Sequence, residues 1–121
     1  MLLLPITLYR GSKDAWMTAK KILLIGSTQY IHSMEIYAGQ STAKGNEVRL
    51  PYFDKDAKSA LMIMEGNREL IEWADEIHLF WSQRTLGTLL DIGMAFALRK
   101  PIKIVYYEKM TIMDFLLEYA K

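Results

Sequence analysis

The chain has 121 residues, of which 51% are hydrophobic and 24% are charged, and these values are typical of one globular domain rather than a disordered segment or a coiled coil. The formal net charge is only +1, which argues against a nucleic-acid-binding protein that relies on a basic face. The sequence contains no cysteine, which excludes a disulfide scaffold, a thiolate zinc site and a cysteine nucleophile, and fits a cytoplasmic location.

The first sixteen residues show no clear periodicity. Their apolar run, residues 1–4, is broken by Pro5, has no basic segment before it and is far shorter than the roughly 20 residues that a membrane span needs. We therefore expect no signal peptide and no membrane partner. The domain proper is expected to begin near Met17, so that residues 17–121 form a single domain and residues 1–16 form an N-terminal extension whose status is open.

Apolar runs alternate with helical patterns along the rest of the chain, which predicts βαβ units. The predicted strands are residues 21–26, 47–50, 76–81 and 101–107. The predicted helices are residues 30–44, 55–75, 87–99 and 111–120. We expect Gly66 and Asn67 to interrupt the second helix, with Asn67 capping its second half. The third helix is apolar nearly all round, which predicts that it is buried.

This pattern predicts an α/β fold: a small flavodoxin-like or Rossmann-like parallel sheet of about four strands, in the order 2-1-3-4, with helices on both faces. Crossovers between parallel strands are almost always right-handed, which limits the alternatives. In such sheets ligands bind beyond the carboxyl ends of the strands, near the switch point between strands 1 and 3. Two loops reach that place, residues 26–30 and 82–88, and we expect the site there.

Candidate substrate-binding residues follow from those loops, because free backbone N–H groups at a helix start favour an anion or a hydroxyl group. The first loop contributes Gly26, Ser27, Thr28 and Gln29. The third strand end and the second loop contribute Trp81, Arg84, Thr85, Gly87 and Thr88. The first loop lacks a full glycine fingerprint, so a plain βα turn is the more ordinary interpretation. Thr85 or Thr88 is expected to cap the helix, and Trp81 either stacks on a base or, as its residue type favours, fills the core.

Asp91 is the one acid of the helix 87–99. It is either a functional carboxylate or an acid that complements the helix dipole, and physical reasoning alone weighs the two evenly. Gly93 favours the functional interpretation, because glycine inside a helix costs about 1 kcal/mol relative to alanine. His32 and His78 lack metal-ligand spacing with any acid cluster, so we expect neither a metal nor another cofactor.

Four segments together carry a more specific signal. They are the strand that ends in Gly26-Ser27, residues 73–77 (WADEI), residues 86–95 (LGTLLDIGMA) and residues 100–102 (KPI). They resemble the nucleoside 2-deoxyribosyltransferase family, including its 2'-deoxynucleoside 5'-phosphate N-hydrolase relatives. The resemblance implies a flavodoxin-like fold, cleavage or transfer at the N-glycosidic bond of a nucleoside or nucleotide, and a homodimer or larger homo-oligomer in which a neighbour completes the site.

The resemblance also implies roles for individual residues. Asp91 falls where the family has a glutamate nucleophile, and Asn67 falls where it has a second carboxylate, although an amide cannot transfer a proton. Asp75 is then the candidate proton donor. Gln29 falls where nucleotide-cleaving relatives have an arginine, which leaves Arg84 as the candidate cation. These departures keep three hypotheses open: a glycosidase or transferase, a catalytically weakened nucleoside-binding module, and an α/β domain whose role is assembly.

Overall fold

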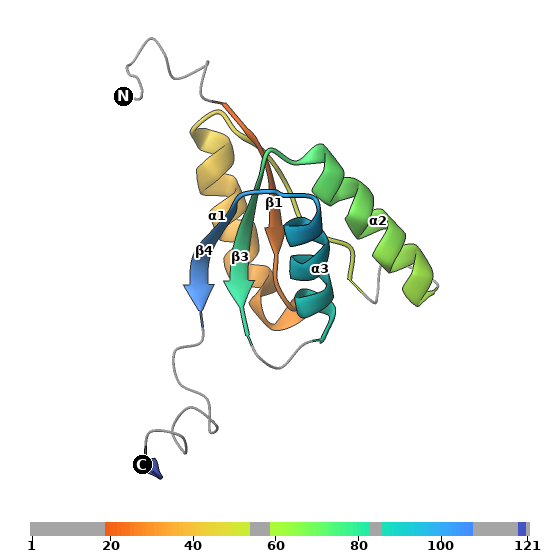
Figure 1. Ribbon diagram of the computed structural model, residues 1–121. Helices are drawn as coiled ribbons and strands as arrows, with labels where there is room; N and C mark the ends of the chain where they lie inside the picture. Colours follow the sequence, from red (N-terminus) through yellow and green to blue (C-terminus); the bar gives the residue numbers. More distant parts are fainter. Residues whose placement is uncertain (1–18, 54–58, 83–85, 108–118, 121) are drawn as a thin grey trace.

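The computed structural model describes residues 19–53, 59–82, 86–107 and 119–120. Four strands within them form one parallel sheet in the order β2-β1-β3-β4 (Figure 1). The strands are β1 (Lys21–Ile25), β2 (Glu47–Arg49), β3 (Glu76–Trp81) and β4 (Ile102–Tyr107). This confirms the predicted fold class and strand order. Residues 1–16 and most of the predicted helix 111–120 lie outside the described residues.

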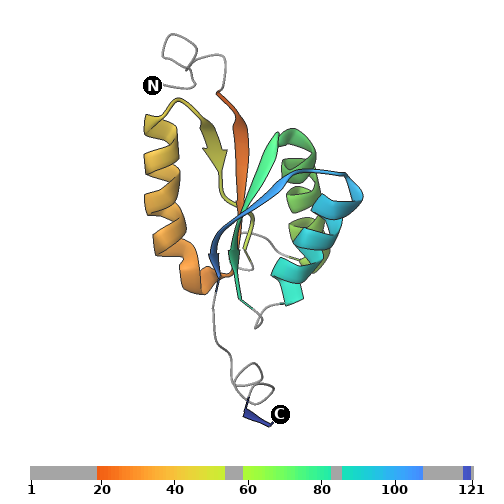
Figure 2. The same cartoon turned by 60° about the vertical axis from the view of Figure 1, so that its left-hand side comes forward.

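Helices cover both faces of the sheet. The helix α1 (Ile31–Ala43), preceded by the short 3-10 helix η3 (Thr28–Tyr30), lies on one face. The helices α2 (Ala60–Trp73) and α3 (Leu86–Ala97) lie on the other face, so the described chain forms three layers (Figure 2). No helix in this part of the chain combines the length and the apolar character that crossing a bilayer requires.

The central strand β1 is buried on both sides, which explains its continuous apolar run. Ile22 and Leu24 belong to the hydrophobic cluster between the sheet and α1, whereas Leu23 and Ile25 belong to the cluster between the sheet and the α2–α3 layer. The alternation follows from the two-residue period of a strand. Because both clusters share this strand, it fixes α1 and α2 relative to each other.

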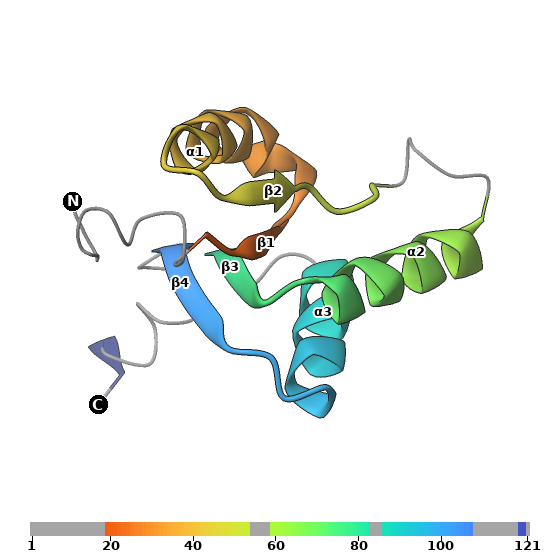
Figure 3. The same cartoon turned by 90° about the horizontal axis from the view of Figure 1, so that it is seen from above.

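The strands all run in the same direction, so the segments that follow β1, β2 and β3 lie at one edge of the sheet (Figures 1 and 3). Gly26 makes the turn after β1 possible. A Cβ atom at this position would lie 3.0 Å from Cβ of Phe80 and 3.1 Å from Sδ of Met34, so a side chain has no room. The chain therefore leaves the sheet directly at Gly26 and delivers Ser27 to this edge.

The helix α2 is continuous from Ala60 to Trp73, so the predicted interruption at Gly66 and Asn67 is wrong, and with it the predicted cap. The N-cap of the helix is instead Ser59, whose side chain accepts a 3.2 Å hydrogen bond from the Met62 N–H. Gly66 has a packing role, because a Cβ atom there would lie 2.7 Å from Cδ2 of Tyr52.

The helix α3 is not buried all round, contrary to the expectation from its composition. Its buried residues are Thr88, Asp91 and Ala95. Ile92 and Met94 are partly buried against the core, whereas four other large apolar residues are between 52% and 79% exposed: Leu86, Leu89, Leu90 and Phe96. The helix packs through one stripe only, so its apolar excess forms an exposed surface on the described part of the chain.

Candidate functional site

A pocket of about 310 Å³ opens at the edge of the sheet where the strands end. Four elements build it. Its walls are Gly26, Ser27 and Thr28 after β1, Pro51, Tyr52 and Phe53 after β2, Ile63, Met64 and Asn67 on α2, and Leu86, Gly87, Thr88 and Asp91 on α3. Its volume suits a small-molecule ligand, and its position is the one that doubly wound sheets use for ligands.

Asp91 lies on the buried face of α3 and lines this pocket. The residue is only 8% exposed. Burial raises the pKa of Asp91 from 3.8 to about 6, and a hydrogen bond from the Asn67 side chain acts in the opposite direction. A carboxyl group with this pKa is mostly ionised at pH 7. The pocket therefore offers a desolvated carboxylate that can act as a nucleophile or as a hydrogen-bond acceptor.

Asn67 is held against the segment after β2. It is 3% exposed, its Oδ1 accepts a 2.7 Å hydrogen bond from the Tyr52 N–H, and its Nδ2 donates a 3.2 Å hydrogen bond to the Tyr52 carbonyl oxygen. The side chain thus joins α2 to the loop that forms the apolar side of the pocket.

Ser27 presents a buried hydroxyl group to the pocket. The residue is 8% exposed, and its Oγ has no hydrogen-bond partner within the described residues. Buried polar side-chain atoms are normally hydrogen-bonded. The position of this hydroxyl group therefore favours a polar ligand atom beside it.

The structure brings together seven of the residues that the sequence singled out: Gly26, Ser27, Thr28, Asn67, Gly87, Thr88 and Asp91. Thr88 lies inside α3 rather than before it, so it does not cap that helix. Arg84 and Thr85 lie outside the described residues. Gln29 is exposed on η3 and is not part of the pocket wall. Trp81 packs against the cluster between the sheet and the α2–α3 layer, which agrees with the core interpretation.

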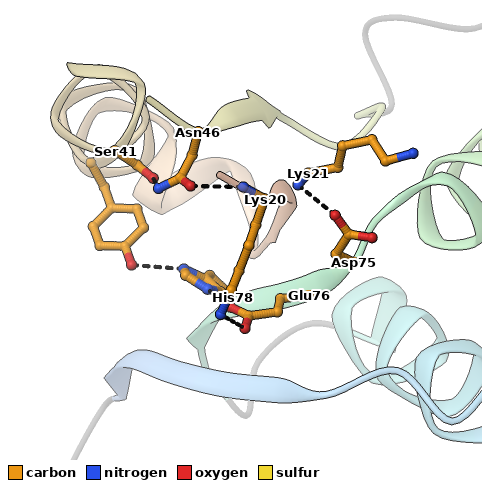
Figure 4. Close-up of polar contacts among 8 residues, drawn as sticks. Lys20, Lys21, Ser41, Asn46, Asp75, Glu76 and His78 are labelled. Atoms are coloured by element: carbon orange, nitrogen blue, oxygen red, sulfur yellow. Dashed lines mark hydrogen bonds and ion pairs between the residues drawn. The ribbon is translucent and has the colours of Figure 1, made fainter. Parts of the chain in front are cut away.

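Asp75 does not reach the pocket. It lies just before β3, at the opposite edge of the sheet, where its Oδ2 accepts a 2.9 Å hydrogen bond from the Lys21 N–H (Figure 4). This contact ties the starts of β1 and β3 together. Asp75 therefore makes a structural contact. It is not placed to act as the expected proton donor in the pocket.

The contribution of the segment after β2 to the pocket was not predicted from the sequence. It contributes Tyr52 and Phe53 to the pocket, and α2 adds Ile63 and Met64. The available signal was topological: the second strand of a parallel sheet ends at the same edge as the first and third, so the residues after Pro51 had to lie near the site.

A second polar cluster, also missed, lies between β3 and α1 at the edge where the strands begin (Figure 4). The Tyr37 hydroxyl group lies 2.7 Å from Nδ1 of His78, and Nε2 of His78 lies 2.9 Å from Oε1 of Glu76, which also pairs with Lys20. Burial raises the pKa of Glu76, but hydrogen bonds and charge from Lys20 and His78 outweigh it and hold the pKa below its usual value.

The same cluster is poorly suited to nucleophilic chemistry. Burial and the charge of Glu76 raise the pKa of Tyr37, so its hydroxyl group stays protonated. Across the described ranges, no group of three or more His, Cys, Asp or Glu side chains is placed to hold a metal ion. We therefore assign this cluster to the cohesion of β3 and α1.

Comparison with known proteins gives a relationship of fold rather than of sequence. No protein-family model and no curated protein sequence matches the chain. Among solved structures, the CMP N-glycosidase BcmB of Clostridium botulinum matches with a TM-score of 0.58 and 23% sequence identity, over 82% of this chain and 78% of that chain. The chain thus has the fold of the CMP N-glycosidase BcmB, over most of the length of both proteins.

Proposed function

We propose that this protein cleaves or transfers at the N-glycosidic bond of a nucleoside or nucleotide, with Asp91 as the nucleophile. The observation that carries the proposal is a carboxyl group that is only 8% exposed and lines a pocket at the strand-end edge of this fold. The structural neighbour acts as a CMP N-glycosidase, which supports the same class of bond.

The reaction would proceed as in retaining glycoside cleavage. An Oδ atom of Asp91 attacks C1' of the sugar, the C1'–N bond breaks, and the base leaves with the bonding electron pair and takes up a proton from water. The resulting glycosyl ester is resolved by water in a hydrolase or by a second base in a transferase. Burial strengthens the attack, because the carboxylate meets the sugar without a full hydration shell.

The walls of the pocket divide into a polar and an apolar side. Ser27 and the first turn of α3 offer a hydroxyl group and backbone N–H groups, which suit sugar hydroxyl or phosphate oxygens. Tyr52, Phe53 and Ile63 offer apolar surface, which suits the face of a base. A nucleoside would then lie with its sugar toward Asp91 and its base toward the loop after β2.

The alternative is a module that binds a nucleoside without cleaving it. Asn67 stands where the family resemblance places a second carboxylate, and it cannot protonate a leaving base. Asp91 and Tyr52 are the ionisable side chains among the described residues of the pocket wall. Wild-type binding without turnover would select this alternative.

A panel of nucleosides, deoxynucleosides and their monophosphates, including CMP, tests the proposal. The purified protein is incubated with each compound and released base is measured by chromatography, with and without a second free base as acceptor. Asp91→Asn is the inactive variant, and Glu69→Gln is the matched control, because Glu69 is an exposed acid on α2 away from the pocket wall. Base release that persists in Asp91→Asn contradicts the proposal.

We further propose a homo-oligomer. The large apolar residues exposed along α3 continue from the pocket wall at Leu86 to Phe96, and such a stripe is typical of a surface that another chain covers.

A further inference from the structure

Asn67 occupies a position in which an amide and a carboxylate are not interchangeable. Its Oδ1 accepts from the Tyr52 N–H at 2.7 Å and its Nδ2 donates to the carbonyl oxygen of the same residue at 3.2 Å. The carboxamide thereby pairs with both main-chain groups of Tyr52, as a neighbouring strand would. An ionised carboxylate only accepts hydrogen bonds, so aspartate could make the first contact and not the second.

The same side chain also reaches the candidate nucleophile. An amide nitrogen carries two hydrogens, and Tyr52 uses one of them. The side-chain hydrogen bond from Asn67 to Asp91 stabilises the charged carboxylate. Asn67 and Asp91 also line the same pocket, so this residue, which is only 3% exposed, links the loop after β2 to the carboxylate on α3.

Gly66 completes the arrangement. The ring of Tyr52 lies over the α2 backbone at this glycine, where a Cβ atom would come within 2.8 Å of both Cδ2 and Cε2 of the ring. Gly66 therefore leaves room for the Tyr52 ring, and Asn67 binds the Tyr52 main chain. Tyr52 is 47% exposed, and its contacts with Gly66 and Asn67 of α2 hold it in position.

We propose that Asn67 is a positioning residue, which locks the Tyr52 segment to α2 and orients the Asp91 carboxylate with the same carboxamide group. This inference rests on the proposed function for its catalytic consequence, but its structural content does not. It also gives the asparagine a role of its own at the position where the family resemblance places a second carboxylate. Restoring an acid with Asn67→Asp should impair the site, because it removes the donor to Tyr52 and places a second carboxylate beside Asp91.

Two variants of the full chain separate the contributions. Asn67→Ala removes every hydrogen bond of the side chain, whereas Asn67→Asp is nearly isosteric and keeps an acceptor for the Tyr52 N–H. Amide hydrogen exchange of Tyr52, followed by NMR, should be slow in the wild type, at least about tenfold faster in Asn67→Ala, and intermediate or unchanged in Asn67→Asp. Fast exchange of the Tyr52 amide in the folded wild type would overturn the lock.

The link to Asp91 is read by a carbon-detected NMR titration of its side-chain carboxyl group. Tyr52 is the other ionisable side chain of the described pocket wall, and it carries no carboxyl group. The Asp91 midpoint should rise in Asn67→Ala, which loses the hydrogen bond, and rise further in Asn67→Asp, by about one pH unit or more, because two adjacent carboxyl groups resist sharing charge. Equal midpoints in all three proteins would contradict the proposal.

Kinetic measurements then distinguish failure of the proposed positioning role of Asn67 from failure of the proposed function. For the compound that the wild type cleaves best, kcat/KM should fall at least about tenfold in both variants, and the acidic limb of the pH–rate profile should follow the NMR midpoint. Turnover that depends on Asp91 but is unchanged in both Asn67 variants would refute the positioning role and leave the proposed function standing. Altered exchange and titration in a wild type without turnover would refute the function and leave the lock standing.

Discussion

The substitution Asp91→Asn tests the central carboxylate in two independent ways. A neutral amide cannot form the glycosyl ester, so base release should disappear. The fold should persist, because asparagine has nearly the same shape and its Oδ1 can still accept from Asn67. The stability of the folded state should increase at neutral pH, because the substitution removes a charge that is held in a site only 8% exposed.

The size of this gain follows from the pKa of Asp91. Raising it from 3.8 to about 6 corresponds to about 3 kcal/mol of destabilisation of the charged form, at about 1.4 kcal/mol for each pH unit. The folded state binds this proton more tightly than the unfolded chain, so the wild type loses stability as the pH rises from about 4 to about 6 and loses no more above it. The free energy of unfolding of the variant should therefore increasingly exceed that of the wild type across that interval, and the variant should unfold roughly 10–15 °C higher at pH 7.5.

Paired measurements check the reasoning. Thermal and urea unfolding of the wild type, Asp91→Asn and the Glu69→Gln control, at several values between about pH 4 and pH 8, give the free energy of unfolding of each. A difference between Asp91→Asn and the wild type that does not grow with pH would refute the buried, raised-pKa carboxyl group. An Asp91 that served only the helix dipole would instead cost about 0.3–1 kcal/mol on replacement and leave base release intact.

Further predictions follow from other features. Asp91→Glu should retain or raise base release, since it restores the side-chain length of the family nucleophile; a complete loss would contradict this. In calorimetry CMP should bind less than about tenfold more tightly than cytidine, because Gln29 brings no charge to the first loop. Glu76→Gln should lessen the loss of stability on acidification below pH 4.5, because the lowered pKa of Glu76 adds stability above that value and loses it below; equal acid sensitivity would refute the ion pair. Light scattering at micromolar concentration should show a homo-oligomer that Leu89→Glu dissociates, whereas a wild-type monomer would refute the α3 interface.

The fold could be predicted from the sequence because hydrophobic periodicity reports the layers directly. Ile22 to Ile25 are apolar without interruption, and only a strand covered on both faces requires that. Strand order followed from connection lengths and handedness rather than from any single residue. These are properties of whole segments, so errors at individual residues did not change them.

The site was harder to predict, because side-chain contacts between segments leave no periodic signal. Gly66 and Asn67 favour a helix break by local propensity, yet tertiary contacts with Tyr52 keep the helix continuous and explain both residue types. Asp75 has the carboxyl group that a proton donor needs, but it lies before β3, at the edge of the sheet opposite to the pocket. The apolar content of α3 was taken for burial because composition does not distinguish a helix in the core from one with an exposed apolar face.

The polar contacts at the edge where the strands begin have a consequence for engineering. Lys20 donates its N–H to Oδ1 of Asn46 at 3.0 Å, and the ion pair of Lys20 with Glu76 joins the same edge to β3. Strand registry is thus secured at the end of the sheet remote from the pocket. Segments on the pocket side can therefore be exchanged or lengthened with little disturbance to strand pairing, which makes this domain a suitable scaffold for grafting loops that recognise other small molecules.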